Sequence, residues 1–302
     1  MNPTPGSRPF PIPVVAFGPL GPGSQEEDEV LDYITMPSGM DTYRAPPLPE
    51  PEELAGHSGA LSVLHAVLGT LQAHLRGEAV APVKLEGLND TDRTLINQVL
   101  GEGEVSAQVL AQPELRCFER SDVRVRVQES VFAGVWRVME MDDEGVEHDH
   151  IEVCDIPAAL RLAAAQDAVL PRAALAPVPS HIINVPTILT ELADQRERWQ
   201  PDNAAHVVNL TLLPLTPEDI GHIDHQLGTG RVLILSRGYG NCRITNTCVA
   251  RTWRVVYYNS SDSVILNSIE VGGLLEVACA AHEDLVDSAE RLTEVLQWVA
   301  QA

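Results

Sequence analysis

The strongest candidate for a metal site is a string of four residues at every second position, namely His148, His150, Glu152 and Cys154. On a β-strand these four side chains share one face, and imidazole, carboxylate and thiolate groups are ligands for zinc or nickel. Residues two apart on one strand are about 6.5–7 Å apart, which is far for neighbouring ligands of a single ion. The alternative is a polar hairpin arm beside an acidic turn. We predict no bound metal or other cofactor, with His148, His150 and Cys154 as the candidates if a metal does bind.

A basic segment within an acidic chain is the second candidate. The chain carries a formal charge of −23, yet the segment from Arg231 to Arg254 contains five arginines and no acidic residue. We predict that a glycine-rich turn in this segment binds a partner protein through Arg237, Gly238, Tyr239, Gly240, Asn241, Cys242 and Arg243. The structural alternative is a charged sheet edge of the kind that prevents aggregation. Met36 and Met40, near the N-terminus, are further candidate contacts.

Motifs of known catalytic sites are missing from the sequence. Gly-x-Gly occurs four times, but no occurrence continues into a dinucleotide fingerprint or a phosphate loop. Two of the four follow expected helices, whereas phosphate binds at helix starts. The sequence also contains no nucleophile elbow and no His-Glu-x-x-His pattern. We therefore predict that the protein is not an enzyme.

Charge and cysteine content limit the partners and the compartment. A charge of −23 repels phosphate backbones and anionic lipids, so nucleic acid is an unfavourable partner. No apolar run approaches the roughly 20 residues that span a bilayer, so we predict no membrane insertion. The five cysteines are widely spaced and odd in number, a pattern that favours reduced thiols over disulfides. We expect a cytoplasmic protein.

An internal repeat organises most of the chain. The first block of the repeat consists of Leu88, Asp92, Ile96 and the run from Leu100 to Val105. Its counterpart lies 127 residues later and ends at Val232. Trp-Arg-Val at Trp136 recurs at Trp253, and Ile-Glu-Val at Ile151 recurs at Ile269. Three ordered blocks with nearly constant spacing indicate a duplicated structural unit.

Each copy has the pattern of an α+β unit. Leucines at helical spacing predict a helix over residues 60–76, and Thr216-Pro217 is a typical helix start. Alternating apolar residues predict strands near 104–110, 123–130, 135–141 and 148–154, followed by a helix over 157–166. We predict two diverged tandem repeats, each an antiparallel sheet with helices packed on it. The expected segments are a Pro-rich extended segment (1–53), the first repeat (54–166), a linker (167–186) and the second repeat (187–302).

The repeated strands also predict matching hairpins. A two-residue turn at Glu144-Gly145 puts Arg137 opposite Glu152. A three-residue turn over 261–263 puts Arg254 opposite Glu270. We interpret both as structural cross-strand pairs, each contributing at most about 1 kcal/mol if exposed.

Several of these motifs resemble one known family. The motifs are residues 209–219, 235–244, 258–260, 265–267 and 269–271 in the second repeat, with 21–25, 36–43, 101–106 and 134–138 earlier in the chain. Together they resemble the HupH/HyaF/HoxQ hydrogenase-expression proteins over nearly the whole chain. One departure is Leu275, where that pattern has Pro immediately before Glu-Val-Ala.

The resemblance implies a cytoplasmic accessory protein in the maturation of nickel–iron hydrogenases. It implies binding of the iron–sulfur small-subunit precursor, which carries a twin-arginine signal, and it transfers no catalytic residues. An acidic chain would attract the cationic start of that signal. Two alternatives stay open. One is a metal or iron–sulfur carrier that uses Cys242, Cys248 or the His148–Cys154 string. The other is an enzyme acting on a cofactor precursor, which needs a deep pocket.

Overall fold

The structure is a computed structural model that describes residues 56–111, 123–142, 144–169, 179, 182–201, 203–238, 240–273 and 276–300. The first repeat contains α2 (Ser58–Leu75), β1 (Val83–Lys84), α3 (Asp90–Leu100), β2 (Val105–Leu110), β3 (Val123–Glu129), β4 (Val135–Met141), β5 (Glu147–Val153) and α4 (Ala158–Val169). The second repeat contains α5 (Val185–Arg198), β6 (His206–Asn209), η2 (Leu210–Leu212), α6 (Pro217–Leu227), β7 (Val232–Ser236), β8 (Asn241–Asn246), β9 (Thr252–Tyr258), β10 (Val264–Val271), η3 (Glu276–Ala278) and α7 (His282–Val299). The predicted Pro-rich segment, with Met36 and Met40, lies outside the described residues, as does Tyr239.

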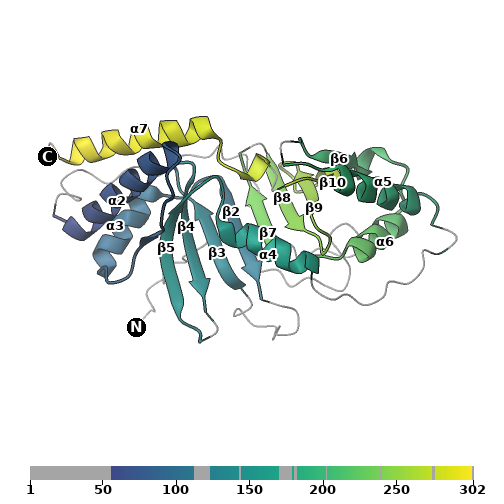
Figure 1. Ribbon diagram of the computed structural model, residues 1–302, viewed down its shortest axis with the longest axis horizontal. Coiled ribbons are helices and arrows are strands. Elements are labelled where there is room, and N and C mark those ends of the chain that lie inside the picture. The colour runs from purple at the N-terminus through teal and green to yellow at the C-terminus, as the bar shows by residue number, and fades with distance from the viewer. Residues whose placement is uncertain are drawn as a thin grey trace.

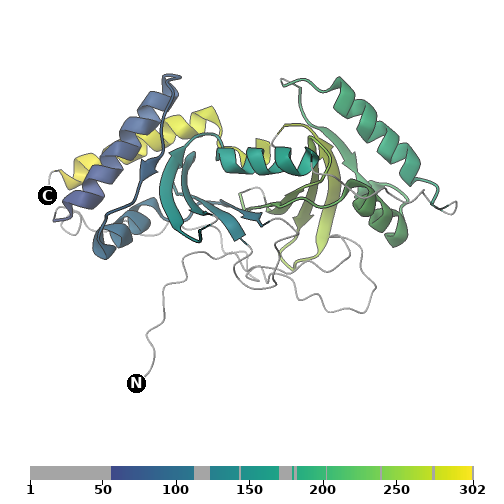
Figure 2. The same cartoon turned by 60° about the horizontal axis from the view of Figure 1, so that its bottom comes forward.

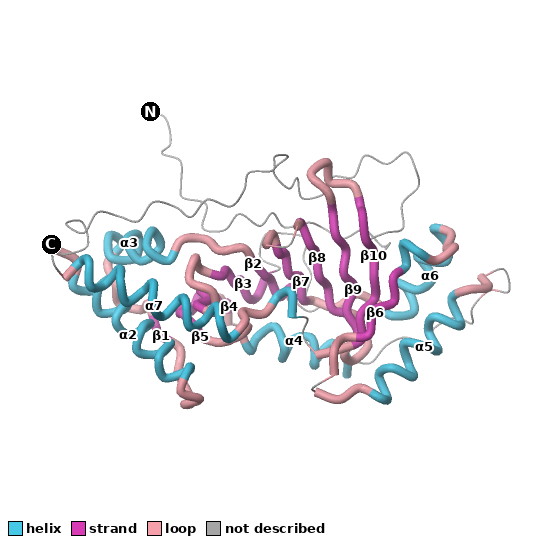
Figure 3. Tube along the Cα trace, turned by 90° about the horizontal axis from the view of Figure 1, so that it is seen from above, coloured by secondary structure: helices cyan, strands magenta, loops and turns pink. Residues whose placement is uncertain are grey.

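The α+β class and the antiparallel pairing are confirmed, but the two repeats share one sheet. Its ten strands follow the order β1-β5-β4-β3-β2-β7-β8-β9-β10-β6 (Figure 1). Strands β2 and β7 lie side by side in the middle, with Ala107 opposite Ile234 (Figure 3). In a single repeat, β2 or β7 would be an exposed edge strand, and the pairing of β2 with β7 covers both of these edges. No described helix is long and apolar enough to cross a membrane.

Local signals account for where the equivalent helices α3 and α6 begin and end. The Asn89 side chain accepts from Asp92 N–H at 2.7 Å and opens α3. Thr216 and Asp219 form a reciprocal capping box at the start of α6, with Pro217 in the first turn. A glycine with positive φ ends each helix, Gly101 at 55° and Gly228 at 67°. The predicted helix start at Thr216 is confirmed.

Three apolar clusters hold helices against the sheet. One lies between α2, α3, α7 and the β4–β5 end of the sheet. A second joins α4 and η3 to the central strands of both repeats. A third lies between α5, α6, β6 and β10. Neighbouring residues Val135 and Trp136 belong to the first and second clusters, so these clusters cover opposite faces of the sheet. Figure 2 shows the two outer helix groups with α4 between them.

The C-terminal helix crosses from the second repeat to the first. Helix α7 packs on α2 through Leu285, Leu292 and Leu296, which join the core beneath α2 and α3 (Figure 3). The predicted leucine stripe of α2 supplies the matching apolar surface, with Leu64 and Leu71 fully buried. In the cluster beneath α5 and α6 no third α-helix takes part among the described residues. Helix α4 also runs to Val169, three residues further than predicted.

Both predicted hairpin pairs are wrong by one residue. Arg137 lies opposite Ile151, and Arg254 lies opposite Ile269, so neither arginine faces the predicted glutamate. The loops set this register. Asp142 Oδ1 accepts from two loop N–H groups, and Asn259 Oδ1 does the same in the second repeat. These Asx turns begin each loop one residue earlier than predicted, and in the second hairpin a β-bulge between Val264 and Leu266 also contributes to the register that puts Ile269 opposite Arg254.

Candidate protein-binding site

The glycine-rich turn joins β7 to β8, as predicted, and presents a short exposed loop. Arg237 is exposed, and its N–H donates to Glu104 O at 3.1 Å. Gly238 lies directly against the Glu104 carboxylate, since a Cβ there would be 1.9 Å from Glu104 Oε2. Gly240 has φ +97°, which also favours glycine. The Arg237 N–H bond to Glu104 therefore ties the loop to the residue before β2, while the Arg237 side chain is exposed.

The residues that follow the loop turn inward. Asn241 is half-buried and Cys242 is fully buried, beside Tyr257. Burial raises the pKa of the Cys242 thiol to about 12, so the thiol is protonated near neutral pH. Arg243 is only 8% exposed, and its guanidinium lies 5.9 Å from the centroid of the Tyr258 ring. Arg243 therefore belongs to the packed sheet.

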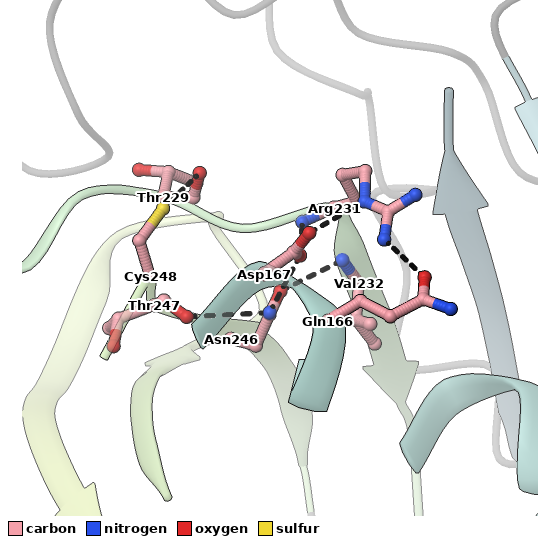
Figure 4. Close-up of polar contacts among 8 residues, drawn as sticks. All are labelled: Gln166, Asp167, Thr229, Arg231, Val232, Asn246, Thr247 and Cys248. Atoms are coloured by element: carbon pink, nitrogen blue, oxygen red, sulfur yellow. Dashed lines mark hydrogen bonds and ion pairs between the residues drawn. The ribbon is translucent and has the colours of Figure 1, made fainter. Parts of the chain in front are cut away.

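The other arginines of the basic segment also have structural partners. Arg231 Nε donates to Asp167 Oδ1 at 2.6 Å, and Arg231 N–H donates to Asp167 Oδ2 at 2.6 Å (Figure 4). Asn246 Nδ2 reaches the same Oδ2 at 2.9 Å. The exposed Arg251 stacks on Trp199 at 4.5 Å. The segment is thus no single cationic surface, and Arg237 is the member that combines exposure with a place in the predicted loop.

Arg254 is buried next to a carboxylate on α6. Its Nη1 lies 3.4 Å from Asp224 Oδ1, and the two side chains are 5% and 9% exposed. Burial raises the pKa of Asp224 to about 6, although Arg254 and Arg243 both oppose that shift. Burial also lowers the pKa of Arg254. Burial thus disfavours the charged forms of both Asp224 and Arg254, as expected for an ion pair shielded from solvent.

His148, His150 and Glu152 of the predicted metal string lie on β5 and Cys154 follows it, with Glu152 in contact with His150 at 3.1 Å and with Cys154 at 4.0 Å. His148 contacts Asp142 and Glu86, whereas His150 contacts Glu152. Burial is the largest cause of the raised pKa of the Cys154 thiol. In the described ranges, no group of three or more His, Cys, Asp or Glu residues is arranged to hold a metal ion. The two histidines therefore contact different carboxylates.

Two carboxylates were missed from the sequence. Asp167 was expected to begin the linker, yet it is 2% exposed and joins α4 to β7 and β8 (Figure 4). Asp224 was not singled out. The repeat carried a signal for Asp224, because residue 97 at the equivalent position is Asn whereas Arg137 and Arg254 match. No pattern in the sequence marked Asp167.

Known proteins match both repeats. The family model described as HupH hydrogenase expression protein, C-terminal conserved region, matches twice, over residues 58–178 and 182–299. The hydrogenase expression/formation protein HoxQ of Cupriavidus necator is 50% identical over 290 residues, covering 96% of this chain and 98% of the relative. The hydrogenase expression/formation protein HupH of Rhodobacter capsulatus is 45% identical over 291 residues, covering 96% and 98%. The hydrogenase-1 operon protein HyaF of Escherichia coli is 34% identical over 291 residues, covering 95% and 97%.

Proposed function

The chain belongs to the HupH family of hydrogenase expression proteins, and on this premise we propose that it is an accessory protein, or chaperone, in hydrogenase maturation. Its client in this proposal is the iron–sulfur small-subunit precursor, which carries a twin-arginine signal, before export and assembly. The proposed compartment is the cytoplasm. Support for the maturation role comes from relatives that carry the name hydrogenase expression/formation protein.

The chemistry of the candidate ligands supports recognition over metal transfer. The thiols of Cys154 and Cys242 are shielded from solvent, and this burial raises their pKa values. His148 and His150 bind different carboxylates and share no ligand cluster. The observation that carries the proposal of protein binding is the exposed Arg237 loop between β7 and β8, tied to Glu104 O by a hydrogen bond.

Charge supports a cationic client. The chain's charge of −23 produces a long-range field that attracts the positive start of a twin-arginine signal. Exposed charges of this kind act mainly on the rate of association and are screened by salt. The Arg237 loop, whose exposed side chain has the opposite sign, would contact an acidic part of the client or of another accessory protein.

The test is an anaerobic pull-down of tagged full-length protein from cells that express the hydrogenase. We expect the native chain to retain the small-subunit precursor and Arg237→Glu to lose most of it. Arg198→Glu is the matched control, because Arg198 is exposed on α5 in a pair with Asp194 and changes the charge equally. A signal-deleted precursor should bind less well at low salt. Retention of no precursor by the native chain would contradict the proposal.

Two other functions remain as alternatives with distinct signatures. A metal or iron–sulfur carrier requires stoichiometric metal in anaerobically purified protein, which elemental analysis would detect. An enzyme acting on a cofactor precursor requires a substrate pocket. The hollows beside Arg254 and beside Arg126 each have a volume of only about 10 Å³. Turnover of a cofactor precursor by the purified chain would replace the chaperone proposal.

A further inference from the structure

The middle of the sheet has one face on which no described helix packs. Ile234 belongs to the apolar cluster beneath α4, so its neighbours Leu233 and Leu235 point to the opposite face. On that opposite face, the cluster beneath α2 and α3 and the cluster beneath α5 and α6 lie at the two ends of the sheet (Figure 2). The side chains between these ends, which we call the central face, are Ser106, Gln108, Arg126, Leu233, Leu235, Arg243, Thr245 and Val256.

Side chains of the central face are nonetheless shielded from solvent. Leu233 is 5% exposed and Val256 is 4% exposed, yet neither belongs to any of the three apolar clusters. The polar neighbours Ser106, Gln108 and Thr245 are 3%, 3% and 4% exposed. An antiparallel sheet face that is open to water keeps its side chains accessible to solvent. The central face therefore has a cover that comes from beyond the described helices and strands.

The charge of the central face indicates the chemistry of this cover. Arg126 and Arg243 stand on it, whereas strands β2, β3, β7, β8 and β9 place no acidic side chain there. Glu129 of β3 points to the α4 side of the sheet, and Asp224 of α6 pairs with Arg254. Carboxylates are therefore the favourable charges beside this face. We expect the cover to combine carboxylates with apolar side chains that pack on the leucines.

The N-terminal segment, residues 1–55, has this composition. It contains nine acidic and two basic residues. The acidic run over residues 26–29 is followed directly by a largely apolar run, with Val30, Leu31, Tyr33, Ile34 and Met36. Two shorter stretches outside the described residues fit less well, because 112–122 has three acidic and two basic residues and 170–178 has no acidic residue.

The N-terminal segment is also long enough to reach the central face. The described chain begins at Gly56, just before α2, whose cluster lies at the β1 end of the sheet. Neighbouring strands are about 4.8 Å apart, so β2 and β7 lie about 20–25 Å from β1. The stretch from residue 36 to residue 55 spans up to about 65 Å when fully extended. Because proline has no N–H donor, a Pro-rich segment is suited to cross the face of a sheet and not to extend its edge.

We propose that residues 26–36 lie across the central face, with their apolar side chains on Leu233 and Leu235 and their carboxylates toward Arg126 and Arg243. The chain thus covers its own sheet with the segment that precedes α2. This inference does not rest on the hydrogenase role, because it follows from the central face and from the composition of the segment. In this arrangement Met36 is held by the chain itself and becomes available to a partner only when the segment is displaced.

Photo-cross-linking in the full chain tests the contact directly. Ile34 is replaced with the photoreactive amino acid benzoylphenylalanine, and mass spectrometry of tryptic peptides locates the cross-link. We expect links to peptides that contain β2, β3, β7 or β8. A mixture of chains with light and heavy isotopes shows whether each link joins residues of one chain or of two. The same replacement at Val15 is the matched control, since it lies in the same segment before the acidic run and should give no link to the central face.

Methionine oxidation is the second measurement. Leu233→Met puts a reporter on the central face with little change in volume, and Met141, which is 36% exposed, is the internal reference. With the segment in place, hydrogen peroxide should oxidise the methionine at position 233 at least about tenfold more slowly than Met141. Adding Leu31→Asp and Ile34→Asp should remove most of this difference. Val14→Asp and Val15→Asp make the same change outside residues 26–36 and should leave it in place.

Links within one chain, together with faster oxidation in the Leu31→Asp, Ile34→Asp chain, support the proposal. Links that join only two different chains would assign the central face to a second copy and overturn it. Fast oxidation at position 233 with the segment unchanged would show an open face that a separate partner covers, which also overturns it. Slow oxidation that persists in the Leu31→Asp, Ile34→Asp chain would assign the cover to another part of the protein.

Discussion

Asp167 joins the two repeats by a buried ionic network, and its removal should destabilise the whole fold. The carboxylate accepts from Arg231 N–H, Arg231 Nε and Asn246 Nδ2, at 2.6, 2.6 and 2.9 Å (Figure 4). Its side chain is 3% exposed and that of Arg231 is 9% exposed. Helix α4 of the first repeat is thereby tied to β7 and β8 of the second. The informative change is Asp167→Asn, because it keeps the shape and removes the charge.

The expected loss follows from the burial of both partners. An asparagine in place of Asp167 turns an N–H group toward at least one of the three donors and leaves Arg231 without its counter-charge. Removing one partner of a buried ion pair costs about 3–5 kcal/mol, because the remaining charge stays desolvated. We expect the free energy of unfolding to fall by about that amount.

Urea unfolding followed by circular dichroism measures this difference. Asp155→Asn is the matched control, because Asp155 pairs with Arg161 at an exposed site where the side chains are 52% and 47% exposed. Exposed substitutions of this kind change stability by about 0.5 kcal/mol or less. If Asp167→Asn and Asp155→Asn differ by less than about 1 kcal/mol, the network does not stabilise the junction and the reasoning is refuted.

Two further outcomes follow from buried groups. Burial raises the pKa of Glu129 from 4.5 to about 7, so the folded chain holds this proton more tightly than the unfolded chain does. The stability that Glu129 contributes is therefore fully present below about pH 4.5 and is lost as pH rises through 7. Glu129→Gln should therefore stabilise the chain by up to about 3 kcal/mol at pH 8 and little at pH 5, because each tenfold change in proton affinity corresponds to about 1.4 kcal/mol; equal effects in urea unfolding at both pH values would contradict this. Cys242, whose burial raises its pKa to about 12, should react with iodoacetamide at pH 8 at least about 100-fold more slowly in the native chain than in urea. Peptide mapping by mass spectrometry measures this, and equal rates would show that the thiol is accessible.

Features encoded in short stretches could be predicted from the sequence. The capping residues at Thr216 and the glycine at Gly101 determine helix ends through bonds within a few residues. Alternating apolar residues predicted β2 to β5 to within one or two residues of their bounds. The repeat was visible because equivalent positions keep their residue types, and the family model matches each copy separately. The exposed loop at Arg237 was located because Gly-Tyr-Gly breaks a strand pattern.

Contacts between residues far apart in the sequence were decided only by the tertiary structure. Strands β2 and β7 pair into one sheet because each would otherwise be an unpaired edge. Helix α7 crosses to α2 because each helix has an apolar stripe that the other covers. The register of the hairpins depends on the side chains of Asp142 and Asn259 within the loops and, in the second hairpin, also on a β-bulge between Val264 and Leu266. The buried partners of Arg231 and Arg254 lie 64 and 30 residues away, at Asp167 and Asp224. Local sequence patterns contain no information on such contacts, since burial and charge pairing arise only when the chain is packed.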